Sequence, residues 1–156
     1  MPVPAHLTIQ IEGLPFESLL ADWRWLVSAK FTPILMTAFG DLFLRDGGHV
    51  HFLDLMAGQF KQIAESEAQF NSLCQDKEQR RTWFIGFLLT EIRKALGELA
   101  IGECYGCKNP LSLGGELAPE NFERTDLRTY YSVIGQLHHQ THNLPLGTKI
   151  NRIKID

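Results

Sequence analysis

The stretch ILMTAFGDLFLRDGGHVHFLDLMAGQFKQIA, residues 34–64, decides the fold class of this chain. It contains four apolar-rich runs of strand length, at residues 34–39, 41–45, 49–56 and 59–64. Asp46-Gly47-Gly48 and Ala57-Gly58 separate the last three runs. Glycine favours tight turns because it reaches positive φ at little cost. The sequence therefore predicts an antiparallel β-meander over residues 34–64.

Apolar residues at helical spacing precede the meander. A short edge strand is expected at residues 7–11. A helix is then expected to begin at Pro15, since proline suits the first helical position. The buried face of this helix is predicted to consist of Phe16, Leu19, Leu20, Trp23, Leu26 and Val27. Pro33 makes a longer helix unfavourable, so the helix should end before the meander begins.

Three further elements are expected after the meander. Ser66 is predicted to cap a helix, with Gln69 at the capping-box position. A long helix should follow from about Asp76 and end at Gly102. Its apolar stripe is predicted to consist of Phe84, Phe87, Leu88, Ile92, Ala95, Leu96 and Leu99. Residues 103–115 are rich in glycine and proline, which predicts an ordered loop with a short strand.

Asp126 is predicted to cap the last helix, which residues 143–147 end. The buried face of this helix is expected to carry Leu127, Tyr131, Ile134, Leu137 and His138. The order helix, meander, helices is typical of α+β proteins and not of strict βαβ alternation. We therefore predict an α+β fold, in which a small antiparallel β-meander packs against several helices. No linker or break in composition is visible, so residues 1–156 are expected to form a single domain.

Composition excludes several functional classes. The 156 residues are 44% apolar, enough for a hydrophobic core without disulfides or metal. The formal net charge of −3 argues against nucleic-acid binding, which needs a clustered basic face. The N-terminal residues lack the pattern of a signal peptide, and no apolar run approaches the ~20 residues of a membrane helix. With three cysteines and these absences, we expect a cytoplasmic protein with free thiols and no membrane partner.

Two cysteines and two histidines have the side chains that zinc prefers. Cys104 and Cys107 are three residues apart, and the i, i+4 spacing of His138 and His142 places both imidazoles on one helix face. The sequence between the two pairs is much longer than the roughly 12 residues of a zinc finger. The alternative is that the cysteines lie in a loop and that the histidines are simply polar or partly buried. A small zinc-binding domain is thus the second functional hypothesis.

His49 and His51 form another candidate pair. On a strand, residues i and i+2 point to the same side, so both imidazoles could bind one metal or one could act as a catalytic base. No third ligand is indicated nearby, and the alternative is two exposed residues after a tight turn. The chain also lacks a nucleophile elbow, a P-loop and a dinucleotide fingerprint. We therefore expect no enzymatic activity and no cofactor.

Four groups of residues together resemble a known family. They are Thr37-Ala38-Phe39-Gly40-Asp41-Leu42-Phe43, His51-Phe52-Leu53-Asp54, Gly102-Glu103-Cys104-Tyr105-Gly106 with Leu111-Ser112-Leu113-Gly114-Gly115, and Asp126-Leu127-Arg128 with Ile134-Gly135-Gln136-Leu137-His138. In this order they resemble the C-terminal domain of bacterial immunity proteins that protect against type VI secretion DNase effectors, a former domain of unknown function. The layout has a looser likeness to the SMI1/KNR4-like immunity superfamily. In the family a bulky aromatic usually stands where this chain has Cys107, which weakens the zinc hypothesis.

The resemblance implies a cytoplasmic, non-catalytic protein that binds and neutralises a cognate toxin. A nuclease has a basic site for nucleic acid, and an acidic partner speeds the encounter with such a site. The candidate partner-binding residues in the loop are accordingly Glu116, Glu120, Glu123 and Asp126. Trp25 lies off the predicted face of its helix and is added because tryptophan is enriched at binding hot spots. The alternative is that the acidic loop is merely solvated and that Trp25 packs under a loop.

Overall fold

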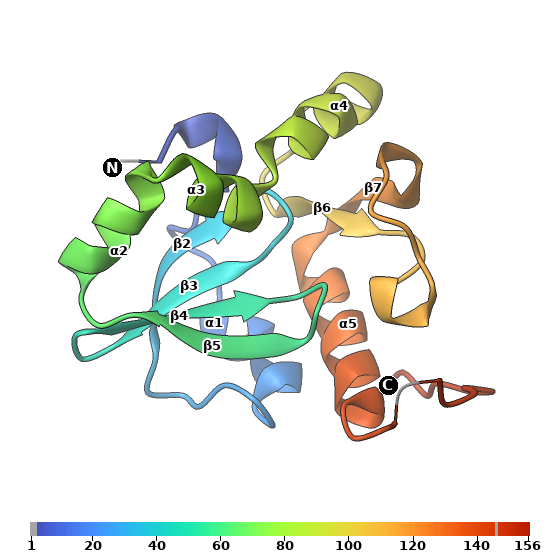
Figure 1. Ribbon diagram of the computed structural model, residues 1–156. Helices are drawn as coiled ribbons and strands as arrows, with labels where there is room; N and C mark the ends of the chain where they lie inside the picture. The colour runs from blue at the N-terminus through green and yellow to red at the C-terminus, as the bar shows by residue number, and fades with distance from the viewer. Residues whose placement is uncertain (1–2, 146) are drawn as a thin grey trace.

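Five antiparallel strands form the central sheet in the computed structural model, which describes residues 3–145 and 147–156. The strands follow one another in the sheet in sequence order: β1 (Thr8–Ile9), β2 (Thr32–Thr37), β3 (Leu42–Asp46), β4 (His49–Asp54) and β5 (Gln59–Ala64). Figure 1 shows this sheet with the helices around it. The predicted meander and the short edge strand are confirmed.

The turns of the meander lie where glycine predicted them. Asp46 pairs with His49, so Gly47 and Gly48 form a two-residue hairpin loop in which Gly47 has a φ of +61°. Leu42 pairs with Leu53 at the other end of the same two strands. The register therefore places the next residues outward, Asp41 and Asp54, beside each other at one end of the sheet.

Both faces of the central strand are covered. Along β3, Phe43 lies in one buried cluster while Leu42 and Leu44 lie in the other, and all three side chains are 0% exposed. Successive side chains of a strand point to opposite faces of the sheet. Since three successive residues are buried, other elements must cover both faces of β3. The sheet is the middle of three layers.

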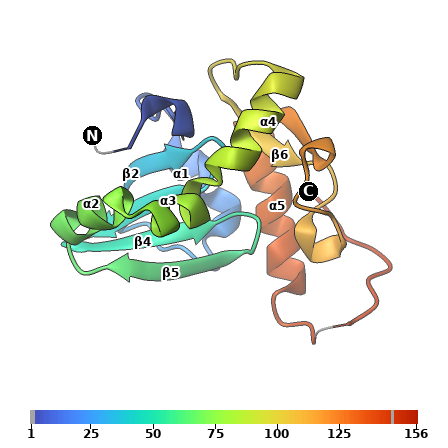
Figure 2. The ribbon, with the colours of Figure 1, turned by 45° about the horizontal axis from the view of Figure 1, so that its top comes forward.

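Helices α2 (Glu67–Gln75) and α3 (Lys77–Phe84) cover one face, and the segment with α1 (Phe16–Leu19) and a short 3-10 helix (Ala21–Trp23) lies on the other (Figures 1 and 2). The last helix, α5 (Leu127–Thr141), packs against this second segment and against the end of the sheet. Its predicted buried residues, Leu127, Tyr131, Ile134, Leu137 and His138, are all buried.

A second, two-stranded sheet pairs β6 (Glu103–Cys107) with β7 (Phe122–Asp126). The Tyr105 amide donates to the Ala38 carbonyl at 3.0 Å, which joins this small sheet to the end of β2. Helix α4 (Gly86–Leu96) lies over it, as Figure 2 shows. Short 3-10 turns at Ala5–Leu7, Leu111–Leu113 and Pro119–Asn121 complete the elements. The fold is α+β, as predicted, although β7 had been expected only as loop.

Local capping signals were accurate. The Ser66 hydroxyl accepts a hydrogen bond from the Gln69 amide at 3.0 Å at the start of α2. The Gln69 side chain reaches back to the Glu65 amide at 2.6 Å, one residue earlier than a capping box requires. Asp126 caps α5 through the Thr129 amide at 2.9 Å.

Two predicted helices are interrupted. The helix from Pro15 ends at Leu19, and the chain tightens into the 3-10 turn so that Leu20, Trp23 and Val27 all reach the same buried cluster. The long helix predicted from Asp76 to Gly102 is split at Ile85, which is left-handed (φ 46°, ψ 49°), and it ends at Leu96 before Gly97.

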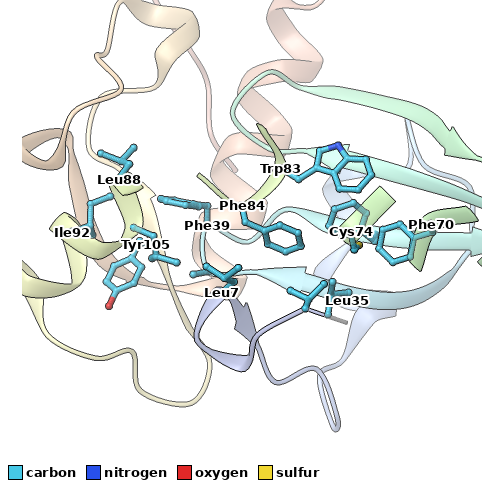
Figure 3. Packing of buried hydrophobic residues seen from close by; sticks show 14 of the residues in the cluster. Leu7, Leu35, Phe39, Phe70, Cys74, Trp83, Phe84, Leu88, Ile92 and Tyr105 are labelled. Atoms are coloured by element: carbon cyan, nitrogen blue, oxygen red, sulfur yellow. The ribbon is translucent and has the colours of Figure 1, made fainter. Parts of the chain in front are cut away.

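The split at Ile85 has a packing reason. Trp83 and Phe84 pack over the central sheet with Phe70 and Cys74, whereas Leu88 and Ile92 pack beside Tyr105 of the second sheet (Figure 3). One straight helix cannot direct apolar residues toward both sheets, so the chain changes direction at Ile85.

No helix in residues 3–145 or 147–156 has the length and apolar content needed to cross a membrane. The signal-peptide prediction involves residues 1–2, and the predicted helix end at residues 143–147 includes residue 146. These three residues lie outside the part of the chain that is described.

Candidate functional site

The loop of residues 108–121, between β6 and β7, is held closed by the side chain of Asn121. Its amide nitrogen donates to the carbonyls of Asn109 at 2.9 Å and of Glu116 at 2.8 Å. Its amide oxygen accepts from the Asn109 backbone at 2.9 Å, and the Lys108 amide donates to the Asn121 carbonyl at 2.7 Å. The two ends and the middle of this braced loop are therefore fixed to one another.

The two glycines of the loop explain the Leu-Ser-Leu-Gly-Gly motif. Gly114 ends the 3-10 turn Leu111–Leu113 with a φ of +94°, a conformation that L side chains rarely adopt. A Cβ on Gly115 would lie 1.8 Å from the Asn109 carbonyl oxygen, so only glycine fits there. The motif is thus required by the closure of the braced loop.

The braced loop presents two of the four acidic candidates to solvent. Glu116 and Glu120 are exposed on it, and Glu123 is exposed on the adjoining strand β7. Asp126 has a different role, because its carboxylate accepts hydrogen bonds from the Thr129 amide and hydroxyl, both at 2.9 Å. These bonds lower the pKa of Asp126 and use its charge to cap α5.

Trp25 lies far from these acids, near the other end of α5. Its indole stacks on His139, with ring centres 5.2 Å apart and planes 4° apart, and lies 4.6 Å from the His142 ring. Its ring nitrogen donates to the Asp22 carbonyl at 3.0 Å. Thirteen residues of helix separate Asp126 from His139, or roughly 20 Å at ~1.5 Å per residue. The structure therefore does not combine Trp25 and the acids in one surface.

The four residues of the zinc hypothesis do not converge. Cys104 and Cys107 lie three residues apart on a strand and therefore on opposite faces, in two different buried clusters. Burial raises the pKa of both thiols, which disfavours the thiolate that zinc needs. His138 Nε2 contacts the Leu55 carbonyl at 2.8 Å, and His142 lies against Trp25. Within residues 3–145 and 147–156, no group of three or more His, Cys, Asp or Glu could hold a metal ion.

The histidine pair on β4 does not form a catalytic site either. His49 is exposed, whereas His51 packs against the rings of Phe31 and Phe60, with ring centres 4.7 Å and 5.0 Å away. Burial lowers the pKa of His51. Its surroundings are aromatic and provide no polar cleft for a base.

A pocket of about 470 Å³ beside the braced loop was not predicted from the sequence. Three parts of the chain form it: the end of the sheet near Asp54, the junction of α3 and α4 at Ile85, and the braced loop at Leu111 and Leu117. Its apolar lining residues are Phe52, Met56, Ala57, Trp83, Ile85, Leu111 and Leu117. The Phe-Gly-Asp motif was a partial signal, since an aspartate between apolar residues in a meander is unusual.

Asp41 of that motif is the buried polar group of the pocket. Its carboxylate accepts hydrogen bonds from the Leu55 amide at 2.9 Å and the Thr37 hydroxyl at 3.3 Å. Burial, and then the nearby Asp54 charge, raise the pKa of Asp41 to about 8. Asp41 therefore favours its neutral form near pH 7. Its two hydrogen bonds connect the end of β2 with the residue that follows β4.

Sequence comparison finds one family model that matches part of the chain. Residues 64–138 match the family model described as T6SS immunity protein Tdi1, C-terminal. This segment is similar to the C-terminal part of the Tdi1 family. It covers just under half of the chain. T6SS denotes the type VI secretion system, and the family is one of immunity proteins, which are typically non-catalytic. The predicted resemblance is confirmed over these residues, whereas the motifs at residues 37–43 and 51–54 lie outside the match.

The Tdi1 segment contains the braced loop, both strands of the second sheet and most of α5. The pocket contains residues from inside and outside the Tdi1 segment. Inside the segment are Trp83, Ile85, Leu111 and Leu117, and before it are Asp41, Phe52 and Asp54. Trp25 also lies outside the segment.

One solved structure extends the likeness beyond the Tdi1 segment. It is the crystal structure of Atu4351 from Agrobacterium tumefaciens, with a TM-score of 0.61 and 15% sequence identity. The similarity covers 86% of this chain and 69% of that one. At this identity the match shows a shared fold, and its coverage of this chain is larger than that of the Tdi1 segment. No curated protein sequence gives a significant match to the chain.

Proposed function

We propose that this protein is an immunity protein that binds and neutralises a cognate type VI secretion toxin in the cytoplasm, and that the toxin is a nuclease. The observation that carries the proposal is the Tdi1 family match over residues 64–138, which includes the whole braced loop. The family supports a role in immunity, the nuclease target comes from the resemblance to immunity proteins against DNase effectors, and the acidic residues of this loop suit such a target.

The braced loop suits a binding role because its shape is set before binding. Asn121 fixes both ends and the middle of the loop, so little conformational freedom is left to lose when a partner binds. Glu116 and Glu120 project from this fixed loop. A nuclease holds nucleic acid with basic residues, so the acids increase the rate of encounter and help to set the orientation of the complex.

The proposal is tested by co-expressing the protein with the effector encoded beside its gene, and by measuring growth and the dissociation constant of the purified pair. The wild type should protect the cells. The double variant Glu116→Lys, Glu120→Lys should bind at least about 10-fold more weakly, because charge reversal at a contact opposes association.

The matched control is the double variant Glu12→Lys, Glu17→Lys, which reverses two exposed acids outside the Tdi1 segment and should bind as the wild type does. A wild type that neither binds nor protects against this effector would refute the proposed function. If both double variants weaken toxin binding equally, binding depends on the net charge of the protein and not on the acids of the braced loop.

A further inference from the structure

We propose that the pocket beside the braced loop receives an arginine or lysine side chain of the bound toxin. This inference rests on the proposed function and names the chemistry of the contact at its centre. The apolar walls of the pocket would hold the carbon stem of the basic residue, and the aspartates at its end would bind the charged group.

The walls of the pocket fit such a side chain. Phe52 and Met56 line it from the sheet, Trp83 and Ile85 from the helices, and Leu117 from the braced loop. Arginine and lysine bury their methylene stems against apolar surface, and a guanidinium also stacks favourably on aromatic faces such as those of Phe and Trp. A volume of about 470 Å³ accommodates a long side chain.

The ionisable side chains of the pocket favour a cation over an anion. Among the described residues that line it, the ionisable ones are Asp41 and Asp54, and no lysine, arginine or histidine is present. Because Leu42 pairs with Leu53, these two aspartates are neighbours across β3 and β4. Their mutual repulsion and the burial of Asp41 disfavour the ionised pair, and a basic group between them would relieve that repulsion.

The position of the pocket favours a protein partner over a free small molecule. Leu117 is 50% exposed at the edge of the pocket, and it directly follows Glu116 on the braced loop. The pocket is therefore continuous with the surface proposed to bind the toxin. A basic residue that enters it would lie within the same interface.

A fragment titration tests the chemistry without the toxin. Benzamidine, a flat apolar cation, is added to the isotope-labelled protein, and amide shifts are compared with those caused by benzoate and benzyl alcohol. We expect benzamidine alone to shift the amides of Leu55, Ala57, Ile85 and Leu117, and Asp54→Asn to reduce the affinity at least about 10-fold. Absence of these shifts, or equal shifts with benzoate, would overturn the inference.

The second test uses the toxin. Ala57 is an exposed lining residue, so Ala57→Trp should fill the pocket and weaken toxin binding at least about 10-fold. Asp54→Asn should have a similar effect, and it keeps an oxygen that can accept from the Ala57 amide.

Two matched controls separate pocket effects from general ones. Ala29→Trp makes the same change at an exposed residue that precedes the Tdi1 segment and does not line this pocket, and Asp46→Asn repeats the Asp-to-Asn change at the other end of the β3–β4 hairpin. Both should bind as the wild type does. If the wild type binds the toxin and the two pocket variants bind equally well, the inference is wrong although the proposed function stands. If the wild type does not bind, the proposed function fails.

Discussion

At the scale of single residues, Gly58 and His138 show how one close contact sets the position of a helix. Gly58 lies in the β4–β5 turn with a φ of +66°, and a Cβ there would lie 2.5 Å from His138 Cγ. The His138 Nε2 atom contacts the Leu55 carbonyl at 2.8 Å. The imidazole therefore lies directly on the turn and joins α5 to the sheet.

We expect Gly58→Ala to destabilise the fold more than the same change in the β3–β4 turn. Gly47→Ala should cost about 1–2 kcal/mol for the left-handed backbone alone, since a Cβ at Gly47 meets no atom within 4 Å. Gly58→Ala should cost about 1–3 kcal/mol more, because the methyl group also displaces a buried ring. Urea denaturation of both variants measures the difference, and equal costs would contradict this account of the contact.

Asp41 provides a prediction about pH. A carboxyl whose pKa is raised on folding stabilises the fold when protonated. Its contribution is complete below the ordinary aspartate pKa of 3.8 and is lost as pH rises through about 8. The free energy of unfolding of the wild type should therefore fall, relative to that of Asp41→Asn, as pH rises from about 4 to about 8.

The difference between the two proteins is the quantity to measure, because burial lowers the pKa of His138 and this acts in the opposite direction. Both proteins contain His138, so its effect cancels in the difference. Urea denaturation at several pH values provides the data. Glu12→Gln, at an exposed acid, is the control and should follow the wild type at every pH. A wild-type curve parallel to that of Asp41→Asn would contradict the assigned pKa.

At the scale of elements, local signals located the helix starts but not the helix breaks. A cap such as Ser66 or Asp126 acts on the backbone three residues later, so it is visible in a short window of sequence. The break at Ile85 follows from the positions of two sheets that the helices must cover. A β-branched residue is a poor choice for a left-handed position, so its own type gave no signal of the break.

The Ile85 backbone predicts an unusual order of stabilities. Ile85→Gly should be more stable than Ile85→Ala by about 1 kcal/mol, because both variants lose the same side chain and only alanine keeps the left-handed strain. At Ala95, an exposed position inside α4, alanine should be the more stable residue, so Ala95→Gly should lower the free energy of unfolding by about 0.5–1 kcal/mol. Urea midpoints of the variants decide this, and an alanine variant more stable than the glycine variant at residue 85 would show that α3 and α4 can join.

At the scale of the whole molecule, the Tdi1 segment depends on the residues that precede it. The Tyr131 hydroxyl donates to the Gly40 carbonyl at 2.5 Å, and the Trp23 indole donates to the Tyr131 carbonyl at 2.9 Å. The Trp23 ring also lies close to Gly135, where a Cβ would be 2.8 Å from the indole nitrogen. The buried face of α5 is thus completed by the meander and by the segment around Trp23.

We therefore expect residues 64–138 alone not to fold cooperatively. Without the meander, the apolar faces of α2, α3 and α5 lose the central sheet, and too little apolar surface is buried to offset the loss of chain entropy. Circular dichroism and urea titration of this segment should show no cooperative transition, while the full chain shows one. A cooperative transition in the isolated segment would refute this dependence.

The candidate site was predictable in part. The surface exposure of Glu116 and Glu120 was predictable, because a loop rich in glycine and polar residues is expected at the surface. The role of Asp126 as a cap was also visible, yet its charge was counted toward the partner surface. The pocket could not be predicted, because its lining residues come from three segments that are distant in the sequence and share no spacing.

The sequence by itself determined the meander, its turns, four helix starts and the family likeness, since each depends on neighbouring residues or on short motifs. The tertiary structure alone decided where helices end, which thiols and imidazoles meet, and where a pocket lies. Those outcomes depend on packing between residues far apart in the chain. Cys104 and Cys107 make the distinction clear: their spacing suggested one zinc site, and the strand that contains them directs their side chains into two separate cores.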